Sequence, residues 1–200
     1  MLLVKSISVK KSLWRIKILL LFSILFFFAN VRIHSQGFRA GVFGVSQFCL
    51  GDNSEYFLNA SGLGLSGEFA FFKHFGISAT GQYAQVIPAS NSPIVFANQI
   101  TFFLGIWGRV PLFGGNVSLQ QSIEPGMIYQ SAKVKSEYDP ISSKPYTDFV
   151  IQIVSSFRYS PPALWEGALE FEIAPVYTFI PMKKNVISDF GARLGVFYKF

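Results

Sequence analysis

Apolar and polar residues alternate with a period of two along most of the chain beyond residue 36. The alternation is clearest over Thr147–Tyr159, Leu169–Phe179 and Asp189–Phe200, where one set of alternate positions is mostly aliphatic or aromatic. Successive side chains of a β-strand point to opposite faces, so this period predicts strands with one apolar and one polar face. No segment of this region has the 3.6-residue period of an amphipathic helix. The predicted fold class is therefore all-β.

Five earlier segments alternate in the same way and bring the predicted number of strands to eight. They lie at about 38–48, 63–71, 77–83, 96–107 and 117–129. Most of the eight are long enough to cross a bilayer at a tilt. Pro125 and Pro175 fall inside strands and lack the N–H that a ladder needs, so we expect a bulge or kink at each.

The connections between these strands alternate in length. The short ones are Lys73–His74, Pro111–Gly115 and Pro161–Gly167. The others, mostly longer and more polar, are Leu50–Ala60, Ile87–Pro93, Ser131–Tyr146 and the brief Pro181–Asn185. An even number of strands with short turns at one end and longer loops at the other predicts an antiparallel up-and-down transmembrane β-barrel.

The apolar faces are more suited to lipid than to a small soluble core. They are large and aromatic on every strand, whereas the polar faces carry the glycine, serine and glutamine that suit a narrow lumen. Five tyrosines lie on apolar faces near strand ends, where they would form belts at the two membrane–water interfaces: Tyr83, Tyr129, Tyr159, Tyr177 and Tyr198. A soluble periplasmic barrel with a lipid-binding lumen remains an alternative.

Charge separates the first 35 residues from the rest. The net charge is +6, and residues 1–35 contain six basic residues and no acid, so the remainder is balanced. This balance removes the main argument for a nucleic-acid partner. The apolar run Ile18–Ala29 follows the basic leader and has the length of a signal-peptide core. We expect a helical signal peptide at 1–35 and a barrel at 36–200, with an uncleaved anchor as the alternative.

The chain ends in the sequence GARLGVFYKF, with apolar residues alternating up to Phe200. With eight predicted strands, it resembles the small outer-membrane barrels: outer membrane protein X, the membrane domain of outer membrane protein A, and the outer membrane protein β-barrel domain families. The resemblance implies a location in the outer membrane of a diderm, Gram-negative-type bacterium. It also implies that the barrel-assembly machinery recognises the last strand through Phe190, Leu194, Val196, Tyr198 and Phe200. The alternative is that these are ordinary lipid-facing residues.

The polar faces carry ten charged residues that we expect inside the lumen: Arg39, Glu68, Glu124, Asp148, Arg158, Glu170, Glu172, Asp189, Arg193 and Lys199. Buried charges persist only when they are paired. Tight hairpins would place Arg158 opposite Glu170, and Glu172 opposite Arg193. The network would plug the lumen, or alternatively form a gated proton or ion path.

No cofactor, metal site or catalytic activity is predicted. His74 falls in a predicted turn, Cys49 is the sole cysteine, and neither joins a cluster of metal-ligating residues. We expect a structural role or an interaction through outer loops, with outer-membrane lipid and an extracellular protein or glycan as partners. Candidate loop contacts are Lys133, Lys135, Tyr138, Lys144 and Tyr146. The alternatives are a narrow channel, an apolar-ligand conduit, or an accessory subunit of a secretion or assembly machine.

Overall fold

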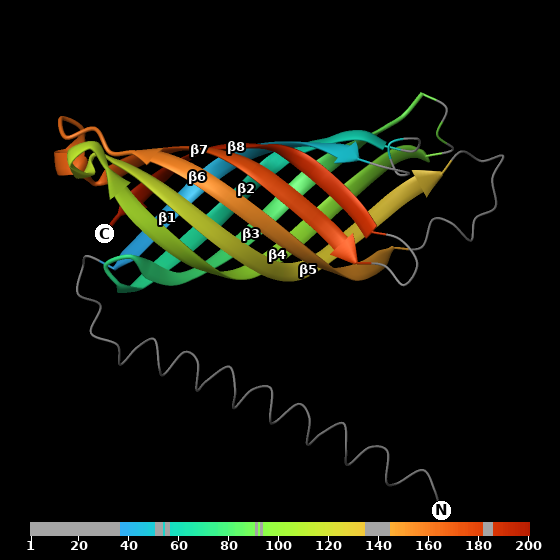
Figure 1. Cartoon of the computed structure of the whole chain (residues 1–200). Helices are drawn as coiled ribbons and strands as arrows, with labels where there is room; N and C mark the ends of the chain where they lie inside the picture. Colours follow the sequence, from blue (N-terminus) through green and yellow to red (C-terminus); the bar gives the residue numbers. More distant parts are fainter. Residues whose placement is uncertain are drawn as a thin grey trace, which may run out of the picture. The chain divides into compact units, whose positions relative to one another are not determined.

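Eight antiparallel strands close into a barrel in a computed structural model of the chain, and each strand pairs with its sequence neighbours (Figure 1). The model describes residues 37–50, 54, 57–90, 92, 94–134, 145–181 and 186–200. The strands are β1 (Phe38–Leu50), β2 (Phe57–Phe72), β3 (Phe75–Pro88), β4 (Ile94–Leu112), β5 (Val117–Val134), β6 (Tyr146–Tyr159), β7 (Leu169–Pro181) and β8 (Val186–Lys199). This confirms the predicted number and order of strands. The predicted signal peptide lies outside the described residues.

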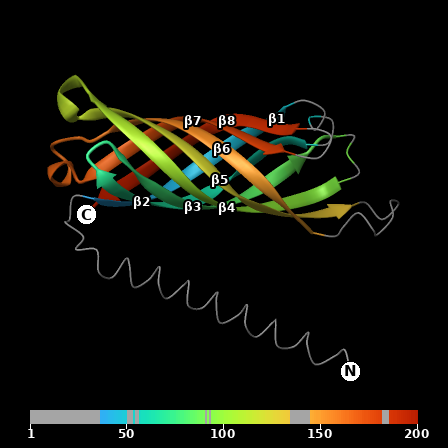
Figure 2. The same ribbon diagram turned by 60° about the horizontal axis from the view of Figure 1, so that its bottom comes forward.

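The strands are steeply tilted against the barrel axis (Figures 1 and 2). Following the register from Arg39 through each strand in turn leads back to β1 at Cys49, ten residues further along. A shift of this size over eight strands corresponds to a tilt of about 40° and to an interior that side chains fill. Strands of 13 to 19 residues are therefore long enough to span a hydrocarbon layer.

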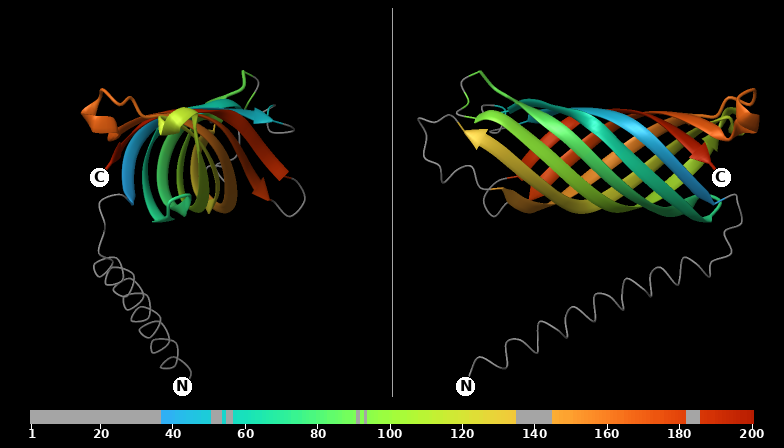
Figure 3. Two further views of the ribbon diagram at one scale, coloured as in Figure 1. Left: turned by 60° about the vertical axis from the view of Figure 1, so that its left-hand side comes forward. Right: turned by 180° about the vertical axis from the view of Figure 1, so that it is seen from behind.

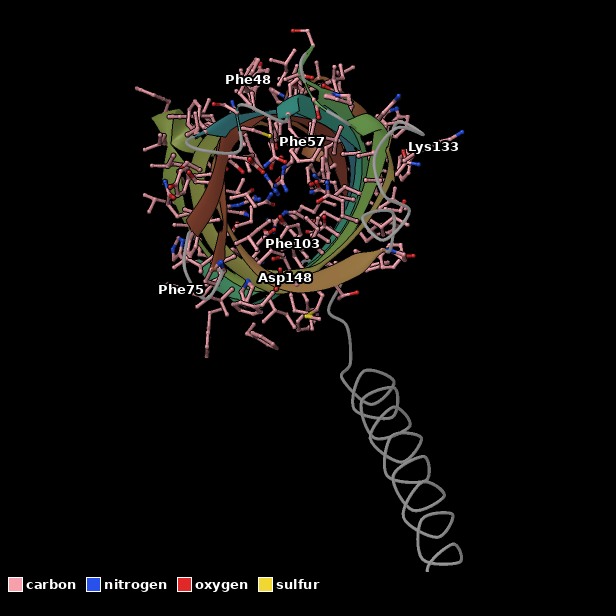
Figure 4. All side chains as sticks on the ribbon, turned by 90° about the vertical axis from the view of Figure 1, so that its right-hand side faces the viewer. Phe48, Phe57, Phe75, Phe103, Lys133 and Asp148 are labelled. Atoms are coloured by element: carbon pink, nitrogen blue, oxygen red, sulfur yellow. The ribbon has the colours of Figure 1, made fainter. Side chains whose placement is uncertain are left out.

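Inward and outward positions alternate along every strand, as the sequence predicts. On β7, for example, Glu170, Glu172 and Ala174 are buried, whereas Phe171 and Ile173 are exposed. Viewed along the barrel, Phe103 points into the lumen, while Phe48 and Phe75 point away from it (Figure 4). The aliphatic and aromatic residues that would form the core of a soluble sandwich thus cover the outside of this barrel.

The two strand prolines do not produce bulges, so the expectation of a bulge at each is wrong. The register continues unchanged on both sides of Pro125 and Pro175. Instead, two residue pairs are missing from the β4–β5 ladder beside Pro125, and two from the β6–β7 ladder beside Pro175. Each proline lacks one N–H and points outward, and the ladder resumes in the same register on its far side.

The short connections lie at one end of the barrel, with both ends of the described chain (Figures 1 and 3). A two-residue turn joins β2 to β3, while 3-10 turns η2 (Phe113–Gly115) and η4 (Trp165–Gly167) lie in the next two connections. Closure is completed by a hydrogen bond from the Phe200 N–H to the Phe38 carbonyl, with the two rings 5.4 Å apart. Among the described residues, no helix is long and apolar enough to cross a membrane.

Candidate functional site: the lumen and the outer surface

A network of ion pairs crosses the lumen at the end that carries the short turns. Four arginines and three glutamates form it: Arg39, Arg109, Arg158, Arg193, Glu68, Glu170 and Glu172. They come from β1, β2, β4, β6, β7 and β8, so the network ties together strands from the whole circumference. We call these seven residues the lumen network. Side-chain nitrogen and oxygen atoms gather inside the barrel (Figure 4).

Arg158 is the centre of the lumen network. Its guanidinium donates two hydrogen bonds to Glu68, at 2.6 and 2.8 Å, and its Nε donates one to Glu172 at 2.8 Å. It also lies 3.6 Å from Glu170 and is 1% exposed. A planar guanidinium that meets carboxylates through paired N–H groups makes strong, directional contacts. Arg158 therefore holds all three glutamates in fixed positions.

The remaining arginines extend the network in both directions. Arg109 binds Glu170 through both terminal nitrogens at 3.0 to 3.2 Å, and Arg39 reaches the same carboxylate at 3.3 Å. On the other side, Arg193 Nε donates to Glu172 at 2.6 Å. Gln120 links the two halves, because it accepts from Arg109 and donates to Glu68. Each of the four arginines thus has at least one carboxylate partner among the three glutamates, in a space that water barely reaches.

Inward aromatic rings support the arginines, and glycines make room for the rings. The Arg158 guanidinium lies 4.0 Å from the Phe197 ring centre, Arg193 lies 4.6 Å from that of Phe43, and Trp107 lies within 6 Å of Arg39 and Arg109. Stacking of this kind stabilises desolvated cations. Each inward ring is paired in register with a glycine on the next strand: Phe43 with Gly64, Phe103 with Gly126, Trp107 with Gly76 and Phe197 with Gly41.

Toward the loop end most of the side chains that line the lumen are neutral. Gln47 and Gln152 both donate to the Thr178 hydroxyl, at 2.7 and 3.1 Å. Apolar side chains, including Phe103, Ile128 and Val150, pack beside them. The ion pairs of the described residues are therefore concentrated toward the turn end, while the buried carboxyl of Asp189 lies at the loop end as the register partner of Thr178.

The lumen network differs from the predicted set in three ways. Asp148 and Lys199 are only half-buried and form no ion pair with any described residue, because they lie near opposite open ends of the barrel. Glu124 and Asp189 are buried but likewise form no ion pair within the described chain; Glu124 accepts from Ser78 and Ser122. Arg109 is an additional member, which sequence reasoning missed although it continues the inward alternation beyond Trp107.

The predicted pairings were also displaced along the strands. Arg158 lies opposite Glu172 rather than Glu170, and Glu172 lies opposite Gly195 rather than Arg193. Glu172 still binds Arg193 diagonally, since long side chains reach neighbouring positions on the same face. Both displacements are two residues, so every side chain remains on its predicted face.

On the outside, the five tyrosines are exposed at outward positions near strand ends. The five residues of the proposed assembly signal are also outward and exposed, and Tyr198 lies in edge contact with the rings of Trp165 and Phe200. At the loop end, Lys133 is exposed near the end of β5 (Figure 4). Lys135, Tyr138 and Lys144 lie outside the described residues, as does the side chain of Tyr146.

Among the described residues no cluster of three or more histidine, cysteine, aspartate or glutamate side chains could hold a metal ion. No family model matches the chain, and no curated protein matches it. Several solved structures do. Neisserial surface protein A has a TM-score of 0.60 at 11% identity, covering 82% of this chain and 97% of that one. This chain has the fold of the small outer-membrane β-barrels.

Two further solved structures share this outer-membrane barrel fold. The outer membrane protein OprG from Pseudomonas aeruginosa has a TM-score of 0.56 at 14% identity, covering 84% of this chain and 97% of that one. Ail, the attachment invasion locus protein of Yersinia pestis, has a TM-score of 0.51 at 12% identity, covering 82% and 99%. Ail has also been solved in complex with the heparin analogue sucrose octasulfate, at a TM-score of 0.50. At these identities the likeness concerns the fold alone.

Proposed function

We propose that the chain is an integral outer-membrane barrel with a closed lumen, which acts without catalysis as a structural element and presents its loops outside the cell. The observation that carries this proposal is the inversion of the usual protein interior. Exposed side chains such as Leu104 and Leu63, each 71% exposed, cover the outside, while Arg158 and Glu68 are buried within. Exposing such an apolar surface to water would cost free energy, whereas the hydrocarbon of a lipid bilayer matches its polarity.

Location and folding can be tested on the unmodified protein. Membranes should retain the protein after salt washing, and unheated samples should migrate differently from heated ones on detergent gels, because a closed barrel resists unfolding. Recovery in the soluble periplasmic fraction would contradict membrane residence and favour the soluble lipid-binding alternative.

The lumen network supports a closed barrel over a channel. Arg158 contacts all three glutamates of the network, and rings fill the space beside the guanidinium groups. Protein reconstituted into planar bilayers should therefore give no discrete conductance steps at moderate voltage. Reproducible steps that scale with the amount of folded protein would instead establish the narrow-channel alternative.

Loop-mediated binding of a sulfated glycan is the interaction we propose. Lys133 is exposed at the loop end, and Lys135 and Lys144 follow it in the chain. Ail, which has the same fold, is known in complex with a sulfated heparin analogue. Replacing these three lysines with glutamine should make folded protein elute from immobilised heparin at lower salt, because fewer cations meet the sulfates. Lys73→Gln, in a turn at the other end, is the control; equal elution of both variants would exclude this glycan site.

A further inference from the structure

The outward surface contains one polar pair within its apolar band. Gln121 on β5 and Ser155 on β6 are register partners, and the Ser155 hydroxyl donates to the Gln121 Oε1 at 2.8 Å. Both side chains point outward. Ser155 lies four residues from Tyr159, which marks the turn end of β6, and Gln121 lies eight residues from Tyr129, which marks the loop end of β5. The pair therefore lies between the two tyrosine belts, where a lipid-facing side chain would meet hydrocarbon.

The pair leaves polar groups without partners on this surface. The Gln121 Nε2 has no hydrogen-bond partner among the described residues, and acyl chains offer no acceptor for its two N–H groups. The backbone ladder is also interrupted here, because Pro175 lies opposite Ser155 across the β6–β7 pairing. By contrast, the outward hydroxyls of Ser46 and Ser61 form a hydrogen bond with each other. This pair lies beyond Tyr83, toward the loops.

The surroundings of the amide are apolar. Gly108 on β4 is the register partner of Gln121 on its other side, and the exposed ring of Phe75 lies against this glycine. Ile123 and Ile153, both exposed, lie one outward position further toward the loop end. Inside a membrane, a polar side chain within an apolar surround is stabilised by a hydrogen bond across an interface.

We propose that the wall formed by β4, β5 and β6 around Gln121 is the contact surface between two copies of this chain in the membrane. A carboxamide is self-complementary, since it carries both donors and an acceptor with a second lone pair. A two-fold axis along the membrane normal places the same patch of each copy against the other. Gln121 of each copy then donates its Nε2–H to the Gln121 Oε1 of the other copy. Acyl chains have no acceptor for this N–H group.

This inference rests on the proposed membrane residence, and disulfide cross-linking tests it separately. With Cys49→Ser removing the chain's sole cysteine, Ile153→Cys places a thiol beside the patch, and Leu65→Cys places one on the opposite wall in β2. Oxidation of intact membranes should yield several-fold more covalent dimer with Ile153→Cys than with Leu65→Cys. Adding Gln121→Leu to the Ile153→Cys protein should remove most of that excess.

Each remaining outcome would overturn the inference. Equal cross-linking at both positions would indicate random collision, and none at either would indicate that lipid alone covers the patch. An excess that survives Gln121→Leu would exclude the amide contact. Heat-dependent gel migration of the same samples reports the folded membrane barrel independently, so a failure of membrane residence would be recognised as such.

Discussion

Replacing Arg158 with methionine should lower the free energy of unfolding of the barrel by about 3–5 kcal/mol, the usual cost of removing one partner from a buried ion pair. Methionine fills much of the space but leaves Glu68 and Glu172 buried without the guanidinium that now binds both. Urea titration of lipid-reconstituted protein, followed by tryptophan fluorescence at Trp107 and Trp165, measures the change.

Two variants make this prediction specific to the geometry. Arg158→Lys retains the charge but cannot bind both carboxylates through a planar fork, so it should recover only part of the loss. Lys199→Met removes a cation at the same end of the barrel that forms no ion pair among the described residues, and it should change stability by less than about 0.5 kcal/mol. If Arg158→Met matched Lys199→Met, the lumen network would contribute no net stability.

Gly62→Ala should lower the free energy of unfolding by about 1–3 kcal/mol, because it forces extra volume into a packed wall. Gly62 is an inward position on β2 and the register partner of Ala84 on β3. A Cβ there would collide with the Tyr83 carbonyl and lie 2.6 Å from the Ala84 Cα. These are backbone atoms of β3, so no side-chain rotation relieves the contact.

Gly44→Ala is the matched control for this substitution. Gly44 lies on the neighbouring strand β1 but faces outward, and a Cβ there would have its nearest atom at 3.9 Å. Because alanine also reduces the freedom of the unfolded chain, this variant should be neutral or slightly stabilising. Equal destabilisation by both alanines, in the same urea titration, would show that a general effect of glycine loss, not inward crowding, is responsible.

The faces of the barrel could be predicted from the sequence because a period of two is a local property of an extended chain. Glu68, Arg158, Glu170 and Glu172 follow from this alternation alone, since adjacent residues differ sharply in polarity. Arg109 was missed because the expected strand ended at Trp107, although the alternation continues through Gly108 and Val110 to the end of β4.

The pairing of the charges could not be predicted, because it depends on the turns. Arg158 is opposite Glu172 because the register partner of Tyr159 is Phe171, two residues beyond the predicted partner, and the connection between them has Trp165, Glu166 and Gly167 at positive φ. Such errors occur in steps of two residues, because a one-residue slip would exchange the two faces. The glycine partners of the inward rings could not be predicted for the same reason, because which glycine lies beside which ring depends on the strand register.

The distribution of the lumen network along the chain has a consequence for how the barrel is assembled. Arg39 and Glu170 are 131 residues apart, and the hairpin of β3 and β4 contributes Arg109 but no network glutamate. Inserted on their own, the β3–β4 and β5–β6 hairpins would each expose a network arginine without a network glutamate to hydrocarbon, which is costly. Closure and the pairing of these charges should therefore occur together, so the chain should enter the bilayer in one cooperative step rather than strand pair by strand pair.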